Sequence, residues 1–197
     1  MERTAPIVLG VVGSPRRGGN TELLVEEVLR GAQDAGAQTD RIFLSELDIH
    51  PCCACERCVR TGECSRMDDM RTVGDTMRAA SVWVLGTPVY LFSPTAQFKA
   101  FLDRWIGLPE NVFAGKRAIL VVPFAAASPE IGEPTLEILR RILRFRSIEH
   151  LDSIVASGLL DLGAVAARPE YLAAAFEAGR RAVSTPRGAP ANESSKE

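Results

Sequence analysis

The sequence contains no long apolar run, no marked excess of charge of either sign, and no cysteine outside one short segment. No stretch approaches the roughly 20 apolar residues that span a bilayer, so we expect no membrane anchor. The formal net charge of the 197-residue chain is −2, which gives no electrostatic reason to expect nucleic acid or an anionic membrane as a partner. The first residues lack the pattern of a secretory signal, which favours the cytoplasm.

Apolar runs and helical patterns alternate along the chain, and this alternation predicts an α/β fold. We expect a doubly wound five-stranded parallel sheet with helices on both faces and a Cys-rich insertion after the second strand. This insertion is expected as irregular chain over 51–66. The expected strands are 7–12, 39–44, 81–86, 117–123 and 148–156. The expected helices are 21–35, 68–80, 95–106, 134–145 and 170–183. One domain over 1–183 and a flexible C-terminal tail over 184–197 follow from the composition.

The loop after the first expected strand carries a pattern that suits an anion. Segment 13–21 reads GSPRRGGNT and leads into a helix, so glycine backbone and helix N–H groups can face one phosphate. The spacing fits neither G-x-x-x-x-G-K-[ST] nor G-x-G-x-x-G, which disfavours a nucleotide triphosphatase. A plain polar turn capped by Asn20 or Thr21 is the alternative reading.

Two further segments carry a distinctive pattern: segment 86–90 (GTPVY) and the helical segment 96–104 (AQFKAFLDR). Together with segment 13–21 they resemble the NAD(P)H-dependent FMN reductase and iron–sulfur flavoprotein group of the flavodoxin-like superfamily, which implies a flavodoxin-like fold for the predicted sheet. The resemblance implies that the FMN phosphate is held by Ser14, Arg16, Asn20 and Thr21. It also implies that the isoalloxazine ring is lined by Thr87, Pro88, Val89 and Tyr90, with backbone amides near its polar edge.

Two features temper that assignment. Segment 123–129 lacks the glycine that relatives place beside the flavin, which puts flavin contacts from this loop in doubt. Lys99 and Asp103 form an i,i+4 pair, and with Arg104 they are expected to be structural rather than catalytic.

Tyr90 has an alternative interpretation, as an aromatic residue of the loop that caps the core.

All five cysteines fall between Cys52 and Cys64, and so dense a group in a reducing compartment indicates a metal or redox site. Four of them have the spacing C-x2-C-x2-C-x5-C, which is related to that of [4Fe–4S] ferredoxins. The segment resembles that of the iron–sulfur flavoproteins, which implies a [4Fe–4S] cluster close to the FMN and ligated by Cys52, Cys55, Cys58 and Cys64. Cys53 is expected to be a buried or spare thiol. A zinc site, a metal-free C-x-x-C thiol site and a motif without its cluster are the alternatives.

These observations predict an FMN-dependent electron-transfer oxidoreductase with a [4Fe–4S] cluster next to the flavin. Its electron donor would be ferredoxin or NAD(P)H, and its acceptor a small molecule or a protein. The alternatives are a cluster-free NAD(P)H-dependent FMN or quinone reductase and a non-enzymatic metal or thiol redox-sensing module. No general acid or base stands out, so no catalytic residue is predicted. The resemblance also implies a homodimer or homotetramer.

Overall fold

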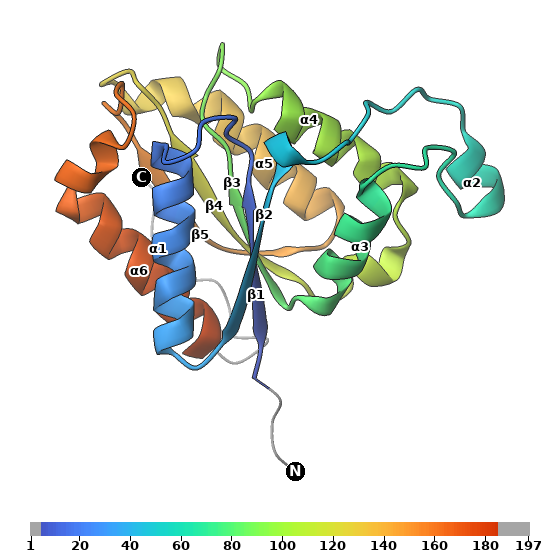
Figure 1. The fold of residues 1–197 in the computed structure, drawn as a ribbon, viewed down its shortest axis with the longest axis horizontal. Helices are drawn as coiled ribbons and strands as arrows, with labels where there is room; N and C mark the ends of the chain where they lie inside the picture. Colours follow the sequence, from blue (N-terminus) through green and yellow to red (C-terminus); the bar gives the residue numbers. More distant parts are fainter. Residues whose placement is uncertain (1–4, 185–197) are drawn as a thin grey trace.

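The chain folds around one parallel sheet, seen in a computed structural model that describes residues 5–184 (Figure 1). The strand order is β2-β1-β3-β4-β5, which is the flavodoxin-like order. The strands are β1 (Ile7–Val12), β2 (Gln38–Phe43), β3 (Val82–Gly86), β4 (Arg117–Pro123) and β5 (Glu149–Ala156). All four pairings between neighbouring strands are parallel, which confirms the predicted fold class.

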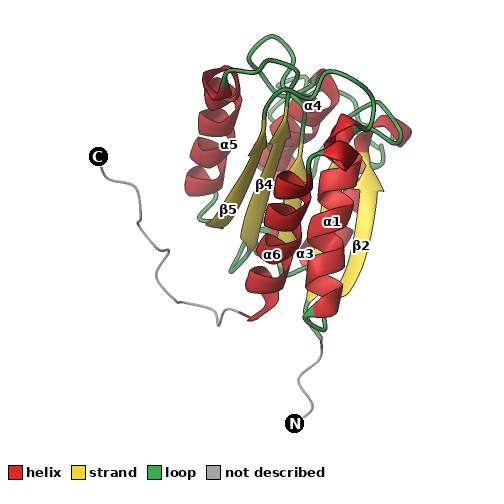
Figure 2. Cartoon of the chain, turned by 90° about the vertical axis from the view of Figure 1, so that its left-hand side faces the viewer, coloured by secondary structure: helices red, strands yellow, loops and turns green. Residues whose placement is uncertain are grey.

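Helices cover both faces of this sheet (Figure 2). They are α1 (Asn20–Asp34), α2 (Arg57–Thr61), α3 (Met70–Ala79), α4 (Ala96–Asp103), α5 (Glu133–Phe145) and α6 (Pro169–Ser184). Short 3-10 turns include Leu44–Glu46, Arg104–Gly107, Glu110–Val112, Pro129–Gly132 and Ala164–Ala167. No helix among residues 5–184 is both long and apolar enough to cross a membrane.

Successive side chains of a strand point to opposite faces, and the core therefore has two halves. Val8 and Val12 of β1 pack with α1 and α6, while Leu9 and Val11 pack with α3, α4 and α5. The second half also holds five large aromatic side chains, which are fully or almost fully buried: Trp83, Phe98, Phe101, Trp105 and Phe113. The sequence alone does not decide between core and interface for Trp83, Phe101 and Trp105, and the structure places all three in the core.

Most expected elements match to within two residues at each end, and three differ more clearly. The expected helix 95–106 is α4, which ends at Asp103 and is followed by the 3-10 turn Arg104–Gly107. The segment expected as irregular chain at 51–66 contains the single-turn helix α2, which ends at Gly62 because that residue adopts a left-handed φ of 76° and donates its N–H to Cys58 O. Ser184, placed in the expected tail, is the last residue of α6. The rest of that tail, 185–197, lies outside the described residues.

Candidate functional site

Four loops at the carboxyl ends of the strands enclose one cavity of about 210 Å³. It lies at the reversal of strand order between β1 and β3, where ligands of doubly wound sheets bind. The loops after β1, β3, β4 and β5 contribute its lining, which is Ser14, Arg16, Gly19, Asn20, Thr21, Pro88, Val89, Tyr90, Pro123, Phe124, Ala125, Leu159, Leu160, Asp161 and Leu162. The structure thus brings seven of the eight residues predicted for cofactor binding to one place.

The first loop presents hydrogen-bond donors to this cavity. The first N–H groups of α1, from Asn20 onward, have no acceptor inside the helix, and Ser14 keeps a hydroxyl proton while its Oγ accepts the N–H of Arg16 at 3.2 Å. Arg16 lines the cavity, whereas Arg17 turns away, with its guanidinium over the ring of Phe43 and its Nε 2.8 Å from a Glu46 carboxylate oxygen. These donors and the helix dipole suit a phosphate.

Asn20 lines the cavity, but its side chain is already fully used. Its Nδ2 donates to Leu159 O at 3.2 Å and to Asp161 O at 2.9 Å, and its Oδ1 accepts the N–H of Val165 at 2.9 Å. The side-chain amide therefore holds the loop after β5 against the first loop, and only the backbone N–H of Asn20 is left to face an anion. The sequence could not show this role because the bonded partners lie about 140 residues away.

Thr87 is the predicted residue that the structure does not bring to the cavity. It is fully buried, its Oγ1 accepts the N–H of Thr95 at 3.1 Å, and the same hydroxyl donates to Pro88 O. The N–H groups of Thr87, Val89 and Tyr90 donate to carbonyl oxygens of residues 121, 123 and 93. These N–H groups are therefore not directed at a ligand, whereas the resemblance implied backbone amides near the polar edge of the isoalloxazine ring. Pro88 has no backbone N–H.

Two buried groups that sequence reasoning missed shape the same region. Glu22 accepts the N–H of Gly18 at 2.7 Å and so fixes the first loop from within α1. Thr95 donates its hydroxyl to Gly13 O at 2.6 Å and also caps α4 by accepting the N–H of Phe98. A Cβ on Gly13 would lie 2.4 Å from Phe98, so only glycine fits there.

An exposed apolar turn stands beside the cavity. Tyr90 and Ser93 exchange two backbone hydrogen bonds, and the central residues Leu91 and Phe92 both have left-handed φ angles, 48° and 63°. Tyr90 is 44% exposed and lines the cavity.

The five cysteines gather around a second, smaller pocket on the cysteine loop (residues 51–66), which projects from the body on the side away from α1 and α6 (Figure 1). Cys52, Cys53, Cys55, Cys58 and Cys64 all contribute to its wall, and all are free thiols. Cys53 is exposed rather than buried. Among residues 5–184 no three His, Cys, Asp or Glu side chains lie close enough to hold a single metal ion.

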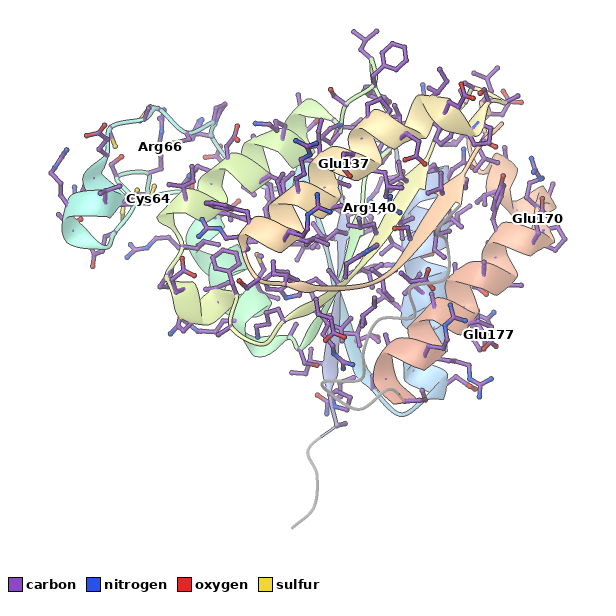
Figure 3. The ribbon with its side chains drawn as sticks, turned by 180° about the vertical axis from the view of Figure 1, so that it is seen from behind. Cys64, Arg66, Glu137, Arg140, Glu170 and Glu177 are labelled. Atoms are coloured by element: carbon purple, nitrogen blue, oxygen red, sulfur yellow. The ribbon has the colours of Figure 1, made fainter. Side chains whose placement is uncertain are left out.

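The cysteine pocket also carries two arginine side chains, one of which has an unpaired hydrogen-bond donor. The buried Nε of Arg66 has no hydrogen-bond partner in the described part of the chain, and Arg104 Nη2 donates to Cys64 Sγ at 3.4 Å. Arg66 and Cys64 lie on this projecting loop (Figure 3). Ala54 and Glu56 adopt left-handed φ angles of 51° and 57° on either side of Cys55. The strained backbone, the unpaired Arg66 Nε and the hydrogen bond from Arg104 to Cys64 fit an anionic, thiolate-ligated group.

A hydrogen bond also acidifies one of these thiols. Cys55 Sγ lies 3.0 Å from Ser65 Oγ, and this contact, followed by the backbone N–H of Arg57, lowers the pKa of Cys55 to about 7. A substantial fraction of this thiol is therefore thiolate at neutral pH, the form that binds metals.

A buried ion pair anchors the cysteine loop to the body. Arg104 donates to both carboxylate oxygens of Asp68, and both side chains are only 2% exposed. Arg104 also donates to His50 O at 2.9 Å, while the carboxylate of Asp68 accepts the N–H groups of His50 and Met70. One charge cluster thus holds both ends of the cysteine loop.

This pair gives the fold an acid-sensitive component. Burial alone would raise the pKa of Asp68, but the hydrogen bond from Arg104, the N–H of His50 and the Arg104 charge together hold the pKa below its usual range. A carboxylate with a depressed pKa contributes stability above its unfolded pKa of about 3.9, and that contribution is lost as pH falls through the folded pKa. We expect Asp68→Asn to be much less stable than wild type at pH 7 and the difference to shrink below about pH 4. Urea unfolding across that range measures it, and a pH-independent difference would contradict the assignment.

The chain is similar in sequence to proteins of a known family. The family model of NADPH-dependent FMN reductase matches residues 6–158. An iron–sulfur flavoprotein of Methanocaldococcus jannaschii is 39% identical over 97 residues, covering 49% of this chain and 50% of that protein. An iron–sulfur flavoprotein of Methanosarcina thermophila is 37% identical over 112 residues, covering 57% of this chain and 59% of that protein. The chain therefore spans between half and three fifths of the length of these relatives.

Solved structures show the same fold. The NAD(P)H:quinone oxidoreductase from Methanothermobacter marburgensis superposes with a TM-score of 0.72 over 93% of this chain and 100% of that one, at 15% sequence identity. At this identity the likeness concerns the fold alone.

Proposed function

The chain belongs to the NADPH-dependent FMN reductase family, and on that premise we propose that it is an FMN-dependent oxidoreductase that carries a [4Fe–4S] cluster. The observation that carries the flavin part is the cavity in which the loops after β1, β3, β4 and β5 converge on the N-terminus of α1. Bound FMN would supply two-electron and one-electron transfer.

The residues of the first loop would hold the FMN phosphate. Ser14 and the first N–H groups of α1, including those of Asn20 and Thr21, would donate hydrogen bonds, and Arg16 would supply charge. Thr87 would fix the conformation of the loop after β3 through its hydrogen bonds to Thr95 and Pro88. Pro88, Val89 and Tyr90 would flank the ring and exclude water from one side. The cavity wall also includes Phe124 and Leu162, which sequence reasoning did not assign.

Cys52, Cys55, Cys58 and Cys64 would ligate the cluster. The donors of Arg66 and Arg104 support this proposal because an iron–sulfur cluster on four thiolates is anionic. The walls of the cysteine pocket and the FMN cavity share no residue, so adjacency of cluster and flavin is itself part of the proposal. We propose further that ferredoxin or NAD(P)H donates the electrons and that a small molecule or a protein accepts them. The proposal also includes a homodimer or homotetramer, a single domain over 1–183 and a cytoplasmic location.

Flavin selectivity tests the first half of this proposal. Each charge-assisted hydrogen bond to the phosphate is worth roughly tenfold in affinity, so FMN should bind the flavin-free protein at least about tenfold more tightly than riboflavin does. Quenching of flavin fluorescence measures both affinities, and anaerobic bleaching of the bound FMN by NADH or NADPH identifies the donor. Equal affinity for FMN and riboflavin would contradict the proposed phosphate site in the first loop. FMN binding by a protein that contains no iron when isolated without oxygen would leave a cluster-free flavin or quinone reductase.

A further inference from the structure

Among the described residues, both acidic side chains in the wall of the cysteine pocket already have a basic partner outside that wall. Glu56 pairs with Arg60 at 3.8 Å, and Asp103 pairs with Lys99 at 2.6 Å. All four of these side chains are at least 44% exposed, so water screens their remaining charge. These acids therefore do not neutralise the two arginine side chains of the same wall.

Arg66 is the arginine of this wall that has no counter-ion in the described part of the chain. Its buried Nε has no hydrogen-bond partner there either. The side chain borders a pocket that all five cysteines line, and it follows Cys64 by two residues (Figure 3). A buried donor without an acceptor costs free energy, so this corner of the pocket is complete only with an acceptor present.

Arg104 is held rigidly against a cysteine of the same pocket. Its side chain is only 2% exposed, and Asp68 and His50 O accept three of its hydrogen bonds. The fourth bond runs from Arg104 Nη2 to Cys64 Sγ at 3.4 Å. This donor keeps its charge at every working pH, and its position is fixed by the body of the protein rather than by a ligand.

Charged donors at the sulfur atoms of a cluster shift its redox equilibrium. Reduction by one electron adds one negative charge to a [4Fe–4S] cluster on four thiolates, and nearby guanidinium groups stabilise that added charge. The reduction potential of such a cluster depends on its net charge, on hydrogen bonds to its sulfur atoms and on its exposure to solvent. Donors that favour the reduced form therefore raise the potential.

We propose that Arg66 and Arg104 raise the reduction potential of the cluster that the cysteine loop carries. Arg66 acts through its unpaired Nε, and Arg104 acts through its hydrogen bond to Cys64. The inference rests on the proposed function, because it takes the cluster from there, and it adds the residues that set how readily the cluster accepts an electron. Both arginines are positioning residues, since neither is a ligand of iron.

A redox titration of the anaerobically isolated, FMN-loaded protein tests this proposal. Dithionite supplies the single electron, and low-temperature electron paramagnetic resonance measures the reduced cluster at fixed potentials. At the wild-type midpoint, Arg66→Met should lower the ratio of reduced to oxidised cluster at least about fivefold, because both the charge and the donor are lost. Arg66→Lys keeps the charge without the planar set of donors, so its ratio should lie between the two.

Arg57→Met is the matched control for these variants. Arg57 is exposed on the same cysteine loop but lies outside the wall of the pocket. The same charge is removed there from a side chain in solvent, so the ratio should stay unchanged. The flavin of each sample is an internal reference, and its midpoint should move less than that of the cluster, because the two pockets share no wall residue.

Arg104→Lys tests the second arginine, because lysine keeps a cation beside Asp68 but cannot bridge Asp68 and Cys64 as a guanidinium does. It should lower the ratio as well. Equal ratios in wild type, Arg66→Met and Arg104→Lys, with iron retained, would overturn the proposal, and so would an equal fall in Arg57→Met. Where Arg66→Met loses its iron, Arg66→Lys and Arg104→Lys decide by the same criterion.

Iron and acid-labile sulfide are assayed on every sample to separate this inference from the proposed function. A wild type without iron would refute the cluster itself, and this inference with it. A wild type with about four irons per chain whose ratio no arginine variant changes would leave the proposed function intact and refute this inference alone.

Discussion

Replacing Arg104 by methionine should lower the free energy of unfolding by about 3–5 kcal/mol, because it leaves the buried carboxylate of Asp68 without its cation. The remaining partners of that carboxylate are the two backbone N–H groups of His50 and Met70. Methionine restores most of the volume of the arginine stem, so the loss reports on charge and hydrogen bonding more than on packing.

Urea unfolding at neutral pH measures this effect, and the chain offers a matched control. Lys99 and Asp103 form an ion pair on neighbouring α4 with a distance of 2.6 Å, but both side chains are about half exposed. Exposed pairs of this kind contribute about 0–1 kcal/mol, so Lys99→Met should change stability little. If Arg104→Met were no more destabilising than Lys99→Met, the anchoring role of the buried pair would be wrong.

A double variant tests whether the loss of stability comes from the unpaired carboxylate of Asp68. Combining Arg104→Met with Asp68→Leu removes both charges together, and replacement of a whole buried ion pair by apolar groups is often close to neutral. The double variant should therefore be more stable than Arg104→Met alone. Because the pair also holds His50 O, we expect incomplete recovery.

Changing Cys58 to alanine should reduce the iron bound per chain from about four to less than one, because a four-iron cluster held by three thiolates is exposed to loss. The side chain of Cys58 lies near Gly107, close to that of Cys64, so it belongs to the inner part of the loop. Iron and acid-labile sulfide per chain, assayed after anaerobic isolation, measure the effect. FMN content should stay unchanged, because no cysteine lines the FMN cavity.

Cys53→Ala is the matched control for that experiment. Cys53 lies on the same pocket wall as the four proposed ligands, so proximity alone does not separate it from them, and only the spacing of the motif does. We expect Cys53→Ala to keep its iron. Iron loss in Cys53→Ala together with retention of iron in Cys58→Ala would require a different set of ligands. Absence of iron from the wild type would contradict the proposed cluster.

Local patterns in the sequence were sufficient for the fold. The apolar runs that became β1 and β4 and the helical spacing that became α1 and α5 match the observed bounds to within one residue. They could be predicted because side-chain periodicity and burial on a parallel sheet are properties of short segments. The loop after β1 was predictable for the same reason, since its glycines and the following helix are contiguous.

The tertiary structure decided which predicted groups are free to act. It directs Arg16 to the cavity and Arg17 to Phe43, although the two are adjacent in sequence. It uses the side chain of Asn20 to hold the loop after β5, and it buries Thr87 beneath its own loop. No local pattern distinguishes these outcomes, because each depends on an acceptor or a surface from a distant part of the chain.

The sequence by itself determined the strand and helix pattern, the phosphate-type loop and the grouping of cysteines, because these are encoded by neighbouring residues. Only the tertiary structure showed that Leu162 and Phe124 share a cavity with the first loop and that Asp68 and Arg104 form a buried pair. The physical reason is that a cavity or a buried pair is made by chain packing. Its members come from different elements, and their juxtaposition depends on the whole sheet and its covering helices.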